Sequence, residues 1–233
     1  MEETTVKVRR LAKNTILLYA RMFLIMIVGL YTSRIILKNL GIVDYGVYNV
    51  IGGTVMMFSL LTTSLSTAIS RYITFTLGTK NVQRLEVVFS TSFVIQLFMA
   101  LVVVVIAEVV GQWFLETTLN IPFERMESAH WVLHCSILIF ALNLLVVPFN
   151  ALIIAHEKMS AFAYISIAEV LMKLIVAFSL TITFYDKLIV YSLLLLGISV
   201  LLLFVYAVYS EQLGDFALGC SSIATLYFVQ DKQ

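Results

Sequence analysis

Two ionisable side chains lie four residues apart in a strongly apolar stretch: Glu169 and Lys173, in the segment AEVLMKLIVAF. On a helix these positions share one face, and glutamate before lysine is the favourable order for an ion pair. A charge at the centre of a bilayer costs about 2.5–3.5 kcal/mol on insertion scales, so intramembrane ionisable groups are functional candidates. The pair predicts a polar pathway inside a membrane protein, and a pair through which transport could be coupled to an ion. The alternative is that the two charges only neutralise each other between packed helices.

Three further basic residues belong to the first apolar part of the chain. Arg21 lies about two turns inside it, where its side chain either snorkels to the interface or faces an internal cavity. Arg34 and Lys38 are four apart and share one helix face, and Asp44 just beyond them could neutralise one of the two. We take Arg21, Arg34 and Lys173 as candidate cations of a substrate cavity. A solvated helix end is the alternative for Arg34 and Lys38.

A proline and two pairs of polar residues mark the fourth apolar run. Pro148 predicts a kink, because proline removes a backbone hydrogen bond within a helix. The amides of Asn143 and Asn150 flank it and are candidates to satisfy the freed backbone groups. His130 and His134 have a spacing that can bind a metal on one helix face, but no third ligand follows at a recognisable spacing. We therefore predict no metal site and read Pro148, Asn143 and Asn150 as a bending element.

Other kinds of chemistry find no support in the sequence. No nucleophile–base pattern and no phosphate-binding loop is present, so we predict neither an enzyme nor a bound cofactor. No basic domain indicates nucleic-acid binding. The two cysteines, Cys135 and Cys220, make no disulfide framework.

The elements that carry these residues are six long apolar runs. The chain is 61% hydrophobic and only 12% charged, and its mean hydropathy is +1.00. A bilayer core of about 30 Å requires about 20 residues of helix, and a backbone in lipid must satisfy its own hydrogen bonds. We therefore predict an all-α integral membrane protein with six transmembrane helices. Their approximate positions are 15–37, 46–69, 87–110, 130–154, 161–184 and 188–209.

The two ends of the chain differ in composition from this apolar region. Residues 1–14 form a polar segment, residues 15–209 the six-helix region, and residues 210–233 a tail of different character. Most basic residues fall on one predicted side of the membrane: Lys7, Arg9, Arg10, Lys13, Arg71, Lys80, Arg84 and Lys158. Fewer fall on the other side: Arg34, Lys38, Arg125 and Lys187. The excess of basic residues in cytoplasmic loops then places the N-terminus in the cytoplasm.

Two stretches resemble a known family. Residues 33–53 read SRIILKNLGIVDYGVYNVIGG and residues 70–78 read SRYITFTLG. They resemble the N-terminal part of the polysaccharide-transporter family, the flippases of lipid-linked oligosaccharides such as O-antigen units. That family belongs to the superfamily that also holds the multidrug and toxin exporters. The matching positions are Arg34, Leu40, Gly41, Tyr45, Gly46 and Tyr48, then Arg71, Tyr72, Leu77 and Gly78.

The resemblance implies both a fold and a function. The family has two six-helix lobes around a central, cationic cavity, and the lobes rock to expose that cavity to each side in turn. The chain would be one lobe of this MATE-like fold in a bacterial inner membrane, a half-size or truncated member that pairs with a second copy or second lobe. Its cargo would be a lipid-pyrophosphate-linked oligosaccharide for polysaccharide or lipopolysaccharide synthesis, with Arg34 in the matched motif as a cavity cation. The alternatives are a lobe of a multidrug or cation exporter, and a non-transporting membrane scaffold or remnant.

Overall fold

The computed structural model describes residues 2–79, 82–117, 121–156, 158–183 and 185–212, and within these ranges the chain is helical apart from short turns. The elements are α1 (Glu2–Met57), α2 (Ser59–Gly78), α3 (Val82–Thr117), the short 3-10 helix η1 (Phe123–Arg125), α4 (Met126–Ala155), α5 (Met159–Ser179) and α6 (Lys187–Gln212). The predicted tail lies outside the described residues from residue 213 onward, and so does Cys220.

Five helical stretches are long and apolar enough to cross a membrane: Leu18–Met57, Gln83–Thr117, Met126–Ala155, Met159–Ser179 and Lys187–Ser210. The protein is therefore an all-α, multi-pass membrane protein by length and composition. Helix α2 is not among these stretches, so hydropathy supports five of the six predicted crossings.

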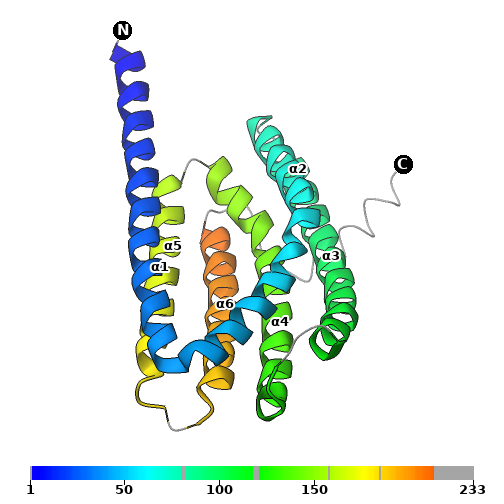
Figure 1. Ribbon diagram of the computed structural model, residues 1–233. Helices are drawn as coiled ribbons and strands as arrows, with labels where there is room; N and C mark the ends of the chain where they lie inside the picture. Colours follow the sequence, from blue (N-terminus) through cyan, green and yellow to red (C-terminus); the bar gives the residue numbers. More distant parts are fainter. Residues whose placement is uncertain (1, 80–81, 118–120, 157, 184, 213–233) are drawn as a thin grey trace, which may run out of the picture.

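The first helix changes direction at Gly41, which has φ +83° and ψ 173°. This backbone region is essentially restricted to glycine, because a Cβ atom would clash there. The part of α1 before Gly41 runs alongside α5, and the part after it runs back through the bundle towards α2 (Figure 1). The first helix thus extends to the Gly41 turn, beyond the end predicted at residue 37.

The structure corrects the prediction of one continuous helix at 46–69. A break at Phe58 divides this segment between α1 and α2. The hydroxyls of Thr62 and Thr63, one turn beyond the break, both donate hydrogen bonds to the carbonyl of Ser59. Back-bonding of this kind often bends helices, since it competes with the regular backbone bonds. The fifth helix also ends earlier than predicted, at Ser179 rather than residue 184.

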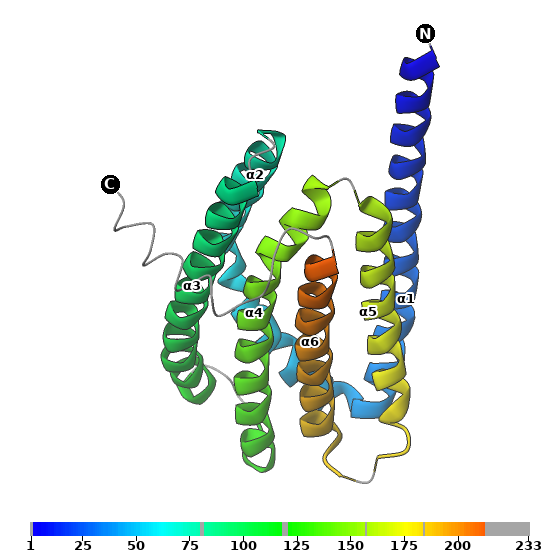
Figure 2. The ribbon, with the colours of Figure 1, turned by 180° about the vertical axis from the view of Figure 1, so that it is seen from behind.

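Helix α4 lies at the centre of the bundle and packs against α6, α3, α2 and α1 (Figures 1 and 2). Its Phe149 is buried, and the rings of Phe89 and Phe93 from α3 meet it edge-on at centroid distances of 5.4 and 5.9 Å. Edge-to-face packing is a preferred arrangement of aromatic rings. Helix α5 lies on the other side of the cavity described below, between α1 and α6.

Pro148 is buried inside α4, and the half of the helix that holds it leans towards α5 (Figures 1 and 2). The Oδ1 atom of Asn150 is buried and has no hydrogen-bond partner among the described residues. Asn143 instead lies beside the cavity between the helices. The three residues of the predicted bending element thus occupy different surroundings on one helix.

Candidate functional site

A cavity of about 230 Å³ lies between helices α4, α5 and α6 and the part of α1 after Gly41, which we call the second part of α1. Its polar lining consists of Tyr48, Ser136, Asn143, Glu169, Lys173, Tyr191, Ser192 and Ser199, and its apolar lining includes Val55, Ile139, Phe140 and Leu195. At about 30 Å³ of liquid volume per molecule, the cavity has room for several waters. Polar and ionisable side chains are tolerated within a bilayer where they face a hollow of this kind among the helices.

The Glu169–Lys173 pair lines this cavity. The lysine Nζ donates to Glu169 Oε1 at 2.6 Å, one helical turn away, and both side chains are partly buried. Hydrogen bonds between ionised groups are shorter and stronger than neutral ones. The predicted ion pair is therefore formed, and it lies at the cavity wall.

Two tyrosines of the cavity lining contact each other across α1 and α6. Tyr48 from α1 and Tyr191 from α6 meet at a ring-centroid distance of 5.0 Å in a T-shaped arrangement. Their neighbour Ser192 donates its hydroxyl to the carbonyl of Leu188 at 2.7 Å, so that this hydroxyl is satisfied within α6. The two rings thus join α1 to α6 at the cavity wall.

A second basic residue, Arg21 of α1, lies against the first turn of α5. The Arg21 guanidinium stacks over the Phe162 ring at 4.2 Å from its centroid, and its Nε atom is buried without a hydrogen-bond partner among the described residues. The Tyr206 phenol of α6 lies beside Ser166 and within electrostatic range of both Arg21 and Glu169. Because Phe162, Ser166, Glu169 and Lys173 recur at helical spacing on α5, they form one face of that helix. This face carries the polar groups from the cavity towards Arg21.

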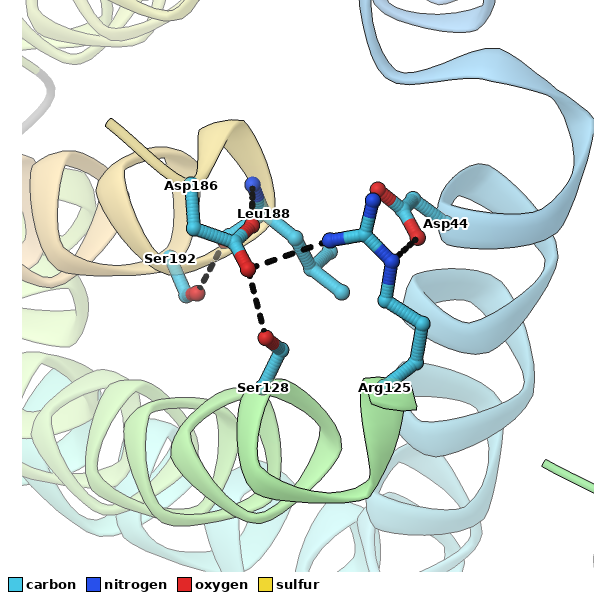
Figure 3. A network of polar contacts seen from close by, with 6 residues as sticks. All are labelled: Asp44, Arg125, Ser128, Asp186, Leu188 and Ser192. Carbon is cyan, nitrogen blue, oxygen red and sulfur yellow. Dashed lines mark hydrogen bonds and ion pairs between the residues drawn. The ribbon is translucent and has the colours of Figure 1, made fainter. Parts of the chain in front are cut away.

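The end of the bundle beyond the two tyrosines is held by a network that we call the Arg125 clasp: Asp44, Arg125, Ser128 and Asp186. Arg125 Nε lies 3.3 Å from Asp44 Oδ1, and its Nη1 lies 3.1 Å from Asp186 Oδ2 (Figure 3). Ser128 donates its hydroxyl to the same Asp186 oxygen at 2.7 Å. The other oxygen, Oδ1, accepts the backbone N–H of Leu188 at 3.0 Å and so caps the start of α6.

A smaller set of contacts reinforces this end. Lys187 Nζ donates to the carbonyl of Asn39 at 3.4 Å, and the Asn39 amide donates to the carbonyl of Ala177 at 3.2 Å. The clasp and these contacts together connect the turn of α1 to the ends of α4, α5 and α6. The sequence suggested that Asp44 could neutralise Arg34 or Lys38, and the structure corrects this. Asp44 pairs with Arg125, whereas Arg34 and Lys38 are exposed.

The structure separates the predicted site residues into groups. Glu169, Lys173 and Asn143 line the cavity, whereas Arg21 of α1 stacks on Phe162 further along α5, and Arg34 is exposed on α1. The sequence reasoning missed the clasp and the lining residues of α6. One signal was available, because Ser192 and Ser199 interrupt an apolar run at a spacing of seven residues, which is one face of a helix.

The two histidines of α4 face glutamates of α3. His134 Nδ1 lies 2.9 Å from Glu108, and His130 Nε2 lies 3.8 Å from Glu116. In the part of the chain that the structure describes, no three His, Cys, Asp or Glu side chains gather as metal ligands would. These pairs connect two helices.

Comparisons with protein families, with curated proteins and with solved structures found no match to this chain. The functional assignment therefore depends on the site itself.

Proposed function

We propose that this chain is a transporter lobe that moves a lipid-linked oligosaccharide across a bacterial inner membrane by alternating access. The observation that carries the proposal is the Glu169–Lys173 pair at the wall of a polar cavity among membrane-spanning helices. Ionisable groups are costly at this depth and are used there for substrate and ion pathways. A purely structural bundle gains nothing from keeping them beside a hollow.

The charge of this region favours an anionic cargo. Arg21 and Lys173 contribute two positive charges along the face of α5, against the single carboxylate of Glu169. The buried Nε of Arg21 is a donor that an anionic group can satisfy. Attraction between charges grows as the effective dielectric constant falls, so a lipid pyrophosphate entering between the helices is drawn more strongly than in water. Its acyl chain stays in the bilayer.

The size of the cavity supports a path built from more than one lobe. Its volume of about 230 Å³ is smaller than typical ligand pockets of about 300–1,000 Å³. We propose that a second copy or second lobe completes the path against the exposed face of α1 that carries Arg34. We also propose that the part of α1 after Gly41 crosses the membrane together with α2, as the remaining span of a MATE-like lobe with a cytoplasmic N-terminus.

The decisive experiment compares Lys173→Met with the parent chain in proteoliposomes that contain a fluorescent lipid-linked oligosaccharide. We expect the rate of lipid flipping to fall by at least about tenfold, the factor that corresponds to 1.4 kcal/mol, while insertion and yield stay unchanged. Methionine keeps the length and apolar character of the side chain but removes the charge. Lys158→Gln is the matched control, because it removes a charge from an exposed position at the start of the same helix.

An unchanged flipping rate for Lys173→Met at equal abundance would contradict the proposed role of the Lys173 charge in transport. A parent chain that flips no lipid-linked sugar, alone or as a dimer, contradicts the transport proposal itself. Export of organic cations with no lipid flipping would instead identify the multidrug exporter alternative.

A further inference from the structure

We propose that the Arg125 clasp is a gate that closes one end of the cavity, and that breaking its ion pairs opens the cavity to that side of the membrane. The inference rests on the proposed transport function, because a gate has meaning only where a cavity must open and close. It adds the residues that hold one gate shut.

The position of the clasp supports a gate. The cavity is lined by the second part of α1 and by α4, α5 and α6. The clasp holds the ends of these elements together (Figure 3), and the contacts of Asn39 and Lys187 add to it. A cavity residue follows each of the two aspartates by about one turn: Tyr48 follows Asp44 on α1, and Tyr191 of α6 follows Asp186, which directly precedes that helix. Movement at the clasp would therefore reach these two tyrosines at the cavity wall.

The charges of the clasp make Arg125 the essential member. Two carboxylates approach one guanidinium, and the Asp44 side chain is only 8% exposed, whereas that of Arg125 is 41% exposed. Without Arg125, two negative groups face each other and one of them is largely shielded from water, which is unfavourable on both counts. Loss of the guanidinium is thus expected to push the start of the second part of α1 away from α6.

The clasp can break without unfolding the helices that it joins. Asp186 uses Oδ1 to cap α6 and Oδ2 to bind Arg125, so α6 keeps its cap when Arg125 leaves. Gly41, three residues before Asp44, already holds the turn from which the second part of α1 can swing. Because Arg125 reaches solvent, water can replace its ion pairs as they separate. A joint with these properties can open and close repeatedly.

The test measures access to the cavity and needs no substrate. A chain with Cys135→Ser and Cys220→Ser receives a single reporter, Ser136→Cys, at the cavity wall. A membrane-impermeant maleimide is applied separately to right-side-out and inverted membrane vesicles. In a separate chain Val43→Cys, which is exposed beside the clasp, identifies the side on which the clasp lies. The rate of labelling at residue 136 from that side reports how open the gate is.

We expect Arg125→Gln to raise that rate by about tenfold or more, since the open conformation of a closed two-state element is populated at about 10% or less. Asp44→Asn, which leaves the Arg125–Asp186 pair and the cap of α6 intact, should raise it less. Glu127→Gln is the matched control, because it removes an exposed charge near Arg125 without touching the clasp.

Unchanged labelling in both Arg125→Gln and Asp44→Asn would overturn the gate, as would rapid labelling of the parent from the clasp side. If size-exclusion chromatography shows that Arg125→Gln does not fold, the Asp44→Asn rate decides the question alone. None of these outcomes depends on lipid flipping, so failure of the gate and failure of the transport proposal remain distinct.

Discussion

At the scale of single residues, this protein uses charge in two different ways. Lys173 meets a carboxylate one turn away on its own helix, at 2.6 Å, and the pair lies beside a cavity. Arg125 instead meets two carboxylates from different parts of the chain, Asp44 and Asp186. The local pair keeps its geometry when helices move, since both partners move together. The clasp does not, and this difference is why we assign a pathway to one and a gate to the other.

Gly41 is the residue whose conformation is most restrictive. We expect Gly41→Ala to destabilise the protein by about 1–3 kcal/mol, because its φ of +83° with ψ of 173° lies in a region that is essentially glycine-only. The measurement is the thermal unfolding midpoint in detergent. Gly46→Ala is the control, because it lies in helical backbone of α1 and its added methyl group would meet no atom within 4 Å. It should leave stability unchanged or raise it by up to about 1 kcal/mol. A similar shift for both variants would contradict the argument.

At the scale of the elements, α2 differs from the other long helices. Its hydroxyl side chains donate to carbonyls one turn back on their own helix, as Ser66, Thr67, Ser70, Thr74 and Thr76 do. A hydroxyl satisfied within its helix costs less in an apolar environment than one without a partner. This back-bonding would lower the cost of the bilayer position that we propose for α2, whose hydropathy alone does not mark it as a span.

A crossing by the second part of α1 together with α2 predicts opposite exposure of its two ends. We expect Val43→Cys and Thr79→Cys, both at exposed positions in the bundle, to react with an impermeant maleimide from opposite sides of the membrane. Labelling in right-side-out and inverted vesicles, in a chain without its native cysteines, makes the comparison. Reaction of both from one side would show that this segment does not cross.

At the scale of the whole molecule, polar groups are separated along the bundle. The start of α1, the end of α2 with the start of α3, and the end of α4 with the start of α5 lie at one end of the bundle, and the clasp region lies at the other (Figures 1 and 2). The cavity lies between α1, α4, α5 and α6, so it belongs to one side of the bundle and not to the interface of α3 with α4. A path through a bundle of this form can be completed from the side of α1.

Completion by a second copy predicts that flipping depends on protein density. We expect the flipping rate per chain to fall steeply as the protein-to-lipid ratio of the proteoliposomes is lowered, because association follows mass action. Chemical cross-linking on the same samples measures the fraction of dimer. A rate per chain that stays constant while the dimer disappears would show that one copy forms the whole path.

Hydropathy and helical spacing were enough to predict the membrane class, the approximate positions of five spans and the Glu169–Lys173 pair. All of these follow from local properties, since hydropathy is summed along a run and an i, i+4 pair needs only helical geometry. The turn at Gly41 and the break at Phe58 escaped this reasoning, because the place where a helix turns or breaks depends on how the flanking segments pack.

The grouping of side chains into shared sites came from the packing of the helices. Asp44 and Arg125 are far apart in the sequence, and no spacing rule connects them. Their contact depends on the return of the chain after Gly41 and on the placement of α4 beside α6. The same packing put Lys173 at a cavity and left Arg34 exposed, because the side of a helix that faces its neighbours is set by every helix in the bundle.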